Sequence, residues 1–264
     1  MTHVFDPHTY IKTITVVGVG GTGSSAARII ARILYDMERR RKHTPQMIFV
    51  DHDVVEEKNI GRQALFTPAD IGKNKAQVVA RRLSFALGLE IGAVPMKFNP
   101  ERHTDRYGGR VDTDLRNLIV SCVDNHEARQ AIHRAKGVFV QSGNEQDHGQ
   151  VVVASSNDAD LILHESNWRN GTVRHLPSEG LLFPSLLEPD PIVTPQPTPS
   201  CGELVEQGSQ SLLVNDWQAL VIGSYVYKLL HRQPIQTFIT FLADGVVSGK
   251  SLTRDNLLAY LDAE

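Results

Sequence analysis

The chain has 264 residues, 41% hydrophobic and 22% charged, which is enough to bury one sizeable core. Its formal net charge of -3 gives no basic excess for nucleic acid or anionic lipid. Its two cysteines, Cys122 and Cys201, exclude a disulfide scaffold. The sequence shows neither a secretory leader nor an apolar run approaching about 18 residues. We therefore expect one soluble, cytoplasmic domain over residues 1–264, without a nucleic-acid or membrane partner.

The first half of the chain alternates strand-like and helix-like segments. A short β-branched run at 14–19 predicts a buried strand, and regularly spaced apolar residues predict a helix over 24–37. The next segments are predicted as strands at 47–51, 90–98 and 117–123, with a helix at 75–87. Strands that alternate with helices indicate parallel βαβ units. We therefore expect a Rossmann-like α/β fold, with a mostly parallel sheet flanked by helices.

Beyond residue 137 the pattern changes. The apolar runs 138–140 and 151–153 are joined by a short polar link, which predicts antiparallel strands added to the sheet in the C-terminal half. Seven of the thirteen prolines lie between Pro177 and Pro199, a density that forbids helix and predicts an extended crossover loop over 177–200. The remaining predicted elements are a helix at 214–231 and a hairpin at 237–252 that turns near Asp244-Gly245.

A glycine-rich motif follows the first predicted strand. Gly18, Gly20 and Gly23 fit G-x-G-x-x-G at the start of a helix, where backbone N–H groups and the helix dipole favour an anion. A tight strand-to-helix turn also requires glycine, and the motif alone does not separate ATP from NAD. Asp51 ends the next strand, where it is placed either to accept a hydrogen bond from a ribose hydroxyl or to form a turn.

Dense polar segments at 51–63 and 72–76 distinguish the chain from a dehydrogenase, because a hydride-transfer site does not need them. Attack of a carboxylate on an α-phosphate places negative charge on the phosphate and on pyrophosphate, so that site needs fixed cations and Mg²⁺. Arg62 and Lys75 can supply the cations, and Asp124 at a third strand end offers an oxygen ligand for Mg²⁺. Each residue alone is equally consistent with a surface charge or a turn; their joint arrangement indicates ATP chemistry.

Four motifs resemble those of the ThiF/MoeB family, which is related to the ubiquitin-activating enzymes. They are G-x-G-G-x-G-S at 18–24, D-x-D-x-V-x-x-x-N-[IL]-x-R-Q at 51–63, G-x-x-K at 72–75 and D-N at 124–125. The resemblance is specific from residue 18 to about 125 and looser beyond 137. It implies one adenylation domain with a nucleotide-binding half over 14–125 and a carrier-binding half over 137–264.

The resemblance also implies which residues hold ATP and Mg²⁺. The implied set is Gly18, Gly20, Gly21, Gly23, Ser24, Asp51, Asp53, Asn59, Arg62, Gln63, Lys75, Asp124 and Asn125. The implied roles are ribose binding for Asp51, phosphate binding for Asn59, Arg62 and Lys75, a place in the same pocket for Gln63, and Mg²⁺ binding for Asp124. Family members adenylate the C-terminal glycine of a small ubiquitin-like protein, and many are homodimers. The implied activity is that adenylation.

The two cysteines receive different interpretations. Cys201 follows the crossover, where the family often carries the cysteine that takes the activated carbonyl, and a thiolate is a strong nucleophile near neutral pH. We consider Cys201 a candidate catalytic nucleophile, with an inert loop cysteine as the alternative, since some relatives stop at the adenylate. Cys122 lies within an apolar strand, and burial of a small side chain explains it.

The chain departs from the family at two places. It lacks paired Cys-x-x-Cys motifs, so no structural zinc is expected. No arginine precedes Arg28, so the arginine that the family commonly contributes to the partner subunit's ATP is replaced or missing. The short, zinc-free form resembles the ThiF proteins of bacterial mobile elements, including PRTRC-type sets. Such sets tend to include a ubiquitin-like protein and sometimes a conjugating-enzyme-like protein.

Three other functions remain open. The first is adenylation of a carboxyl group on a peptide or on a modified tRNA base. The acidic pI of about 6.4 argues mildly against the tRNA substrate. The second is a non-catalytic nucleotide-binding module in an assembly, and the third is an oxidoreductase. Retention of Arg62, Lys75 and Asp124 together argues against the second, and the dense polar segments argue against the third.

Overall fold

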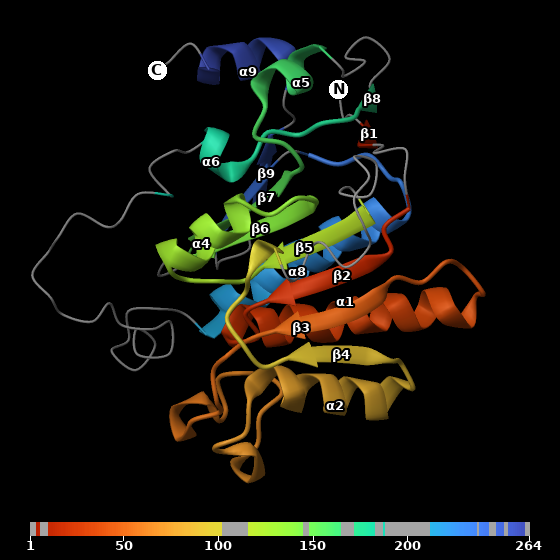
Figure 1. Cartoon of the computed structure of the whole chain (residues 1–264), viewed down its shortest axis with the longest axis vertical. Coiled ribbons are helices and arrows are strands. Elements are labelled where there is room, and N and C mark those ends of the chain that lie inside the picture. Colours follow the sequence, from red (N-terminus) through yellow and green to blue (C-terminus); the bar gives the residue numbers. More distant parts are fainter. Residues whose placement is uncertain are drawn as a thin grey trace, which may run out of the picture.

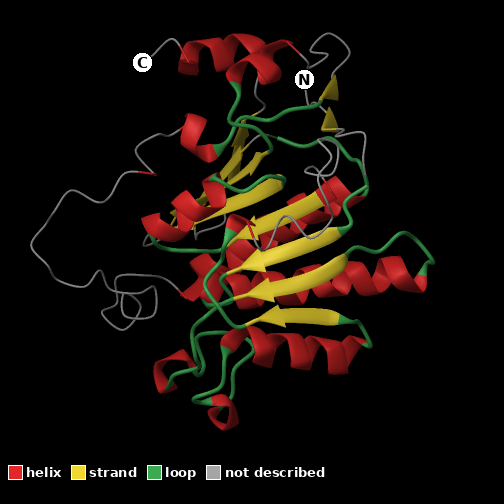
Figure 2. Cartoon of the chain, viewed as in Figure 1, coloured by secondary structure: helices red, strands yellow, loops and turns green. Residues whose placement is uncertain are grey.

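The computed structural model describes residues 4–5, 10–101, 116–144, 148–164, 172–182, 187, 212–236, 238–242, 247–250 and 253–261. Within them an eight-stranded sheet has the strand order β10-β9-β7-β6-β5-β2-β3-β4 (Figures 1 and 2). Its strands are β2 (Thr13–Val17), β3 (Gln46–Val50), β4 (Ile91–Val94), β5 (Asn117–Ser121), β6 (Val138–Asn144), β7 (His148–Ala154), β9 (Phe238–Leu242) and β10 (Val247–Lys250). A separate parallel pair joins β1 (Val4–Phe5) to β8 (Thr172–Val173).

The sheet has a parallel part and an antiparallel part. Strands β4, β3, β2, β5 and β6 are parallel neighbours, with Ile14 opposite both Met47 of β3 and Leu118 of β5. Strands β7, β9 and β10 extend the sheet beyond β6 in antiparallel pairing. This arrangement confirms the predicted Rossmann-like fold with antiparallel strands in the C-terminal half. The parallel strands end at a common edge, and the strand order reverses beside β2, which is where open α/β sheets bind ligands.

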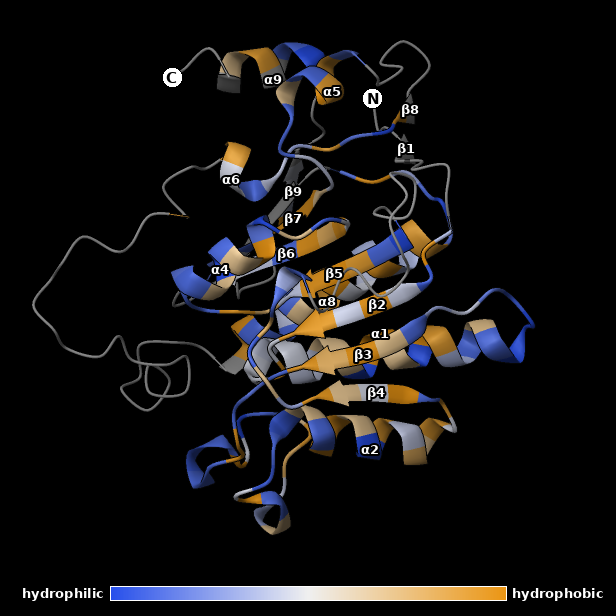
Figure 3. Ribbon diagram, viewed as in Figure 1, coloured by the Kyte–Doolittle hydropathy of each residue, from blue (hydrophilic) through white to orange (hydrophobic). Residues whose placement is uncertain are grey.

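Alternating side chains bury both faces of the sheet. Ile14 and Val16 of β2 belong to the larger core cluster, which also contains residues of α1 (Gly21–Arg39), α2 (Lys75–Leu87) and α8 (Leu212–Leu230). On the opposite face, Val17 and neighbouring side chains pack with Ile132 of α4 (His126–His133). Successive strand residues point to opposite faces, so β2 contributes side chains to both core clusters. Figure 3 shows hydrophobic residues concentrated along these strands.

The predicted helices are present, and α2 has the predicted bounds. The Asn74 side chain accepts a hydrogen bond from Gln77 N at 3.1 Å and caps the first turn of α2. Gly88 ends the helix with φ of 72°, a left-handed conformation that favours glycine. Helix α1 extends beyond the predicted range at both ends, while α8 begins two residues before and ends one residue before the predicted 214–231. None of the helices in the described part of the chain combines the length and hydropathy needed to cross a membrane.

Several predicted bounds were wrong. Strand β2 ends at Val17 rather than at Val19, and β4 is shorter than the predicted 90–98 segment. A helix, α6 (Glu179–Leu182), lies inside the crossover range, where none was expected. The stretch between Pro177 and Pro184 contains no proline, and the Ser178 hydroxyl accepts a hydrogen bond from Leu181 N at 3.0 Å. The crossover residues 188–200 and the predicted turn at Asp244-Gly245 lie outside the described residues.

The remaining elements were not predicted. Besides α4 and α6 they are the helices α5 (Ala159–His164) and α9 (Arg254–Leu261), the 3₁₀ helices η1 (Glu57–Asn59) and η2 (Pro68–Asp70), and the strands β1 and β8.

An ion pair connects α4 to α6. Arg129 Nη1 lies 3.3 Å from Glu179 Oε1 and 3.4 Å from Oε2, and Glu179 is 3% exposed. Gln130 Nε2 donates to the Leu187 carbonyl oxygen at 2.8 Å. Burial raises the pKa of Glu179 above its ordinary value of 4.5, although the Arg129 guanidinium opposes that shift. The pair thus makes a charged carboxylate tolerable between the two helices.

Replacing Arg129 by methionine should destabilise the fold in a pH-dependent way. Without its partner the Glu179 carboxylate is buried and uncompensated, at a cost of about 3 kcal/mol near pH 8. The raised folded-state pKa means that this cost is absent below the unfolded pKa and grows as pH rises toward the folded pKa. Urea unfolding of Arg129→Met between pH 4.5 and pH 8 measures it.

The matched control is Arg134→Met, because Arg134 is exposed and follows the same helix. It should change the unfolding free energy by less than about 0.5 kcal/mol. A loss in Arg129→Met that is the same at every pH would contradict the burial argument for Glu179.

Candidate functional site

The turn between β2 and α1 requires glycine at two positions. Gly18 has φ of 79°, and a Cβ there would lie 2.7 Å from the Cys122 carbonyl oxygen. A Cβ on Gly23 would lie 1.9 Å from the Gly18 carbonyl oxygen. The motif therefore lets the start of α1 pack directly against the turn and against the end of β5. The first N–H groups of α1 consequently face the carboxyl edge of the sheet, where a helix N-terminus favours an anion.

Asp51 joins this turn to the end of β3. Its Oδ2 accepts a hydrogen bond from Val19 N at 2.7 Å, and its Oδ1 accepts one from Asp53 N at 2.8 Å. Burial raises the pKa of the Asp51 carboxyl, although both N–H donors oppose the shift. Asp51 lines the cavity described below. Each carboxylate oxygen has a second lone pair, so Asp51 can also accept a hydrogen bond from a ligand hydroxyl.

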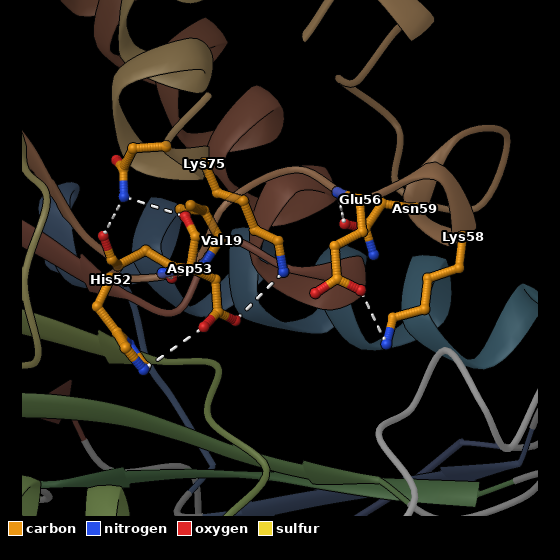
Figure 4. Close-up of polar contacts among 9 residues, drawn as sticks. Val19, His52, Asp53, Glu56, Lys58, Asn59 and Lys75 are labelled. Carbon is orange, nitrogen blue, oxygen red and sulfur yellow. Dashed lines mark hydrogen bonds and ion pairs between the residues drawn. The ribbon is translucent and has the colours of Figure 1, made fainter. Parts of the chain in front are cut away.

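Two ion pairs follow Asp51 along the chain (Figure 4). Lys75 Nζ lies 3.2 Å from Asp53 Oδ2, and the Lys75 side chain is 10% exposed. Lys58 Nζ lies 2.9 Å from Glu56 Oε2. The buried Asn59 accepts a hydrogen bond from Glu56 N at 2.8 Å through Oδ1, which fixes the turn of η1. Cationic groups are therefore held at this edge, and each is compensated by a neighbouring acid.

The end of β5 brings Asp124 and Asn125 to the same edge. Asp124 is exposed, and Asn125 is the N-cap of α4, whose Oδ1 accepts from Ala128 N at 2.9 Å. The role of Asn125 that the structure displays is therefore helix capping. Its predicted contact with a nucleotide stays a prediction.

These residues surround a cavity of about 390 Å³, a size typical of small-molecule sites. The predicted residues that line it are Gly18, Gly20, Gly21, Asp51, Asp53, Asn59, Gln63, Lys75, Asp124 and Asn125. Apolar side chains such as Met96, Phe98 and Val123 also line it, so it combines polar and apolar walls.

Three predicted residues are described but do not line the cavity. Gly23 packs against Gly18, and the Ser24 hydroxyl donates to the Gly21 carbonyl oxygen at 3.2 Å, so both support the turn. Arg62 is half-buried just after η1, and its backbone N donates to the Asn59 carbonyl oxygen at 3.3 Å. One further predicted residue, Cys201, lies outside the described residues.

Helix α8 contributes residues that the sequence analysis missed. Asn215 and Gln218 line the cavity, and Thr22 Oγ1 lies 2.9 Å from Oδ1 of Asn215 and 2.9 Å from Oε1 of Gln218. The Ser25 hydroxyl donates to Asp216 Oδ1 at 2.8 Å. The sequence did contain a signal for them, since two polar amides stand three residues apart in an otherwise apolar helix. Residues at positions i and i+3 of a helix lie on the same face.

The fit of a magnesium ion depends on which oxygens are engaged. In the described part of the chain, Asp51, His52 and Asp53 offer ligand atoms within 4.8 Å of one another. The Asp51 oxygens accept from two backbone N–H groups and Asp53 pairs with the Lys75 ammonium group, so the charges of these two carboxylates are compensated without a metal ion. Asp124 adds an exposed carboxylate to the same cavity. Such oxygen donors suit Mg²⁺ when it also carries phosphate oxygens.

The fold is Rossmann-like, and its cavity lies where proteins of that class bind ligands. Residues 11–184 match the ThiF family, and the chain belongs to that family.

Curated relatives resemble about half of the chain. Ubiquitin-like modifier-activating enzyme 5 of Drosophila melanogaster is 34% identical over 131 residues, which are 47% of this chain and 30% of that protein. The protein of the same name from Culex quinquefasciatus is 33% identical over 132 residues, with the same two coverages. The matched region thus spans about 30% of the length of these relatives.

Solved structures resemble nearly the whole chain. E. coli MccB with ATP is 17% identical, with a TM-score of 0.55, over 92% of this chain and 64% of that one. E. coli MccB with MccA-N7isoASN is 16% identical, with a TM-score of 0.57, over 92% of this chain and 65% of that one. At this identity the likeness supports the fold alone.

Proposed function

We propose that this protein uses Mg²⁺ and ATP to adenylate the C-terminal carboxylate of a small ubiquitin-like protein. The observation that carries the proposal is the gathering of Asp51, Lys75 and Asp124 in one cavity beside the glycine turn. Membership of the ThiF family and likeness to ubiquitin-like modifier-activating enzymes support the same chemistry. A hydride-transfer reaction would leave this set of charges without a role.

In the proposed reaction a carboxylate oxygen of the carrier attacks the α-phosphorus of ATP. The new P–O bond forms as the bond to the β-phosphate oxygen breaks, and pyrophosphate leaves with the bonding electrons. Mg²⁺ held near Asp124 would neutralise charge on the phosphate oxygens. Asp51 accepts from a ribose hydroxyl, and Lys75 turns from Asp53 toward the phosphates as their charge grows. Arg62 does not line the cavity in the structure, and in the proposed reaction its side chain turns toward the phosphates as a second cation, next to Asn59 and Gln63 of the cavity wall.

A second proposed step transfers the acyl group to Cys201. The thiolate attacks the acyl carbon, AMP leaves, and a thioester forms. Cys122 does not compete as nucleophile, because burial raises the pKa of its thiol to about 12. We further propose a homodimer and a conjugating-enzyme-like partner that receives the carrier. Arg28 lies exposed on α1, where it is accessible to a second subunit as a substitute for the missing N-terminal arginine.

Replacing Lys75 by methionine should lower ATP–pyrophosphate exchange by about 100-fold or more, because a fixed cation near the developing charge is lost. The assay uses the whole chain with a small ubiquitin-like protein that ends in glycine-glycine as the carrier. Lys73→Met is the matched control, since the Lys73 side chain is exposed and donates to the Ala69 carbonyl oxygen. It should retain exchange. Equal exchange in Lys75→Met and the wild type would contradict the assigned role.

Replacing Cys201 by alanine should leave exchange intact and abolish a carrier adduct that thiols reverse. Adenylation precedes the proposed transfer, and the other cysteine has a strongly raised pKa. Gel electrophoresis with and without dithiothreitol measures the adduct. An adduct that persists unchanged in Cys201→Ala would refute the transfer step while leaving adenylation standing.

A further inference from the structure

The segment that connects β3 to α2, residues 51–74, contributes several side chains to the wall of the cavity, among them Asn59 and Gln63. We call this segment the β3–α2 loop. It consists of η1, η2 and turns, and Figure 1 shows it in orange beside the start of α2. Ordering a loop of this length costs much conformational entropy, so the loop needs fixed contacts to keep one form.

Arg82 of α2 holds the middle of the β3–α2 loop. Its Nη1 donates to the Leu65 carbonyl oxygen, and its Nη2 donates to Thr67 Oγ1 at 3.0 Å and to Asp70 Oδ2 at 2.6 Å. The Thr67 hydroxyl donates its own proton to Asp70 Oδ2 at 2.6 Å. Each Nη of a guanidinium carries two hydrogens, so all of these bonds can form at once. Asp70 is 2% exposed, and its buried carboxylate therefore depends on these donors.

The residues that Arg82 contacts are continuous with those of the cavity wall. Immediately after Leu65, Phe66 N donates to the Gln63 carbonyl oxygen at 3.3 Å. Gln63 N in turn donates to the Asn59 carbonyl oxygen at 3.0 Å. Gln63 and Asn59 line the cavity, whereas Arg82 does not. Arg82 therefore acts on the cavity through the loop.

Helix α2 is anchored separately from these contacts. Its residues Ala76 and Val79 are buried in the larger core cluster. Lys75, seven residues before Arg82 on the same helix, lines the cavity from its own place on α2. Loss of the Arg82 contacts should consequently loosen the β3–α2 loop locally and leave Lys75 in position.

Resting on the adenylation proposed above, we propose that Arg82 is a positioning residue that keeps the β3–α2 loop in its ATP-binding form before the nucleotide arrives. This form presents Asn59 and Gln63 to the cavity and keeps Arg62 next to them. A loop that is ordered for only part of the time lowers the apparent affinity for its ligand by the ordered fraction. Arginine suits the role because its planar fork serves three acceptors, a geometry that the ammonium group of lysine does not reproduce.

Replacing Arg82 by methionine should raise the KM for ATP in pyrophosphate exchange about tenfold, while kcat stays within about twofold of the wild type. Saturating ATP selects the ordered loop and so restores kcat. Calorimetry should show the same rise in the Kd for ATP with Mg²⁺. An arginine that merely stabilised the fold would act differently, because a smaller folded fraction lowers kcat at an unchanged KM. Arg81→Met is the matched control, since Arg81 is exposed on α2, and it should match the wild type.

Hydrogen exchange of the whole chain without nucleotide measures the loop directly. In Arg82→Met the amides of residues 59–73 should exchange about tenfold faster than in the wild type, while those of β2 and β5 should be unchanged. Arg82→Lys should give a smaller increase in the same amides, because lysine keeps the charge and loses the fork. It also replaces the methionine variant in every measurement if methionine disturbs folding.

Two results would overturn the inference while leaving adenylation in place. One is an unchanged exchange rate of the loop amides in Arg82→Met, and the other is a fall in kcat at an unchanged KM for ATP. If the wild type neither binds ATP nor catalyses pyrophosphate exchange, the adenylation proposal fails, and the inference about Arg82 fails with it.

Discussion

The carboxylate of Asp51 holds together the two loops on which the rest of the cavity depends. One oxygen accepts from Val19 in the turn before α1, and the other accepts from Asp53 at the start of the polar segment. Burial raises the pKa of Asp51, so its ionised form requires those two N–H groups. The same hydrogen bonds that make the charge tolerable also set the position of the glycine turn relative to β3. Geometry and electrostatics are thus coupled at one side chain.

Around Asp51 the structure keeps opposite charges in close pairs. Lys75 is paired with Asp53, and Lys58 with Glu56, so each of these two cations lies beside an acid. A polyphosphate would compete with Asp53 for Lys75, and it would meet the positive end of the α1 dipole at the same place. Asp53 therefore keeps Lys75 at the cavity before a ligand arrives, and Lys75 would have to exchange this carboxylate for a phosphate when the ligand binds.

The sequence predicted the parts of the structure that depend on local patterns. The bounds of α2 were predictable because Asn74 caps its start and Gly88 requires a left-handed conformation at its end. The turn at Gly18 was predictable because the motif follows a β-branched run. Helix α6 was missed because proline density was judged over the whole crossover, while the residues around Ser178 form a local cap.

Contacts between distant segments were beyond sequence reasoning. Gln218 reaches the cavity only because α8 packs beside α1, a tertiary arrangement that helical periodicity does not specify. Arg62 is the opposite case, a residue that the sequence predicted in the cavity and that the structure places outside its wall. A motif match placed it with Lys75, yet Lys75 lines the cavity and Arg62 does not, because the turn after η1 directs adjacent residues differently. Motif spacing thus indicates a set of residues more reliably than the orientation of each member.

We propose that the turn connected to β3 by Asp51 forms an ATP site. Titration calorimetry of the whole chain with ATP and with NAD, each in the presence of Mg²⁺, tests it most directly. ATP should bind with one site per chain, and NAD should neither bind nor displace it. Saturable binding of NAD together with no binding of ATP would rule out an ATP site at this turn.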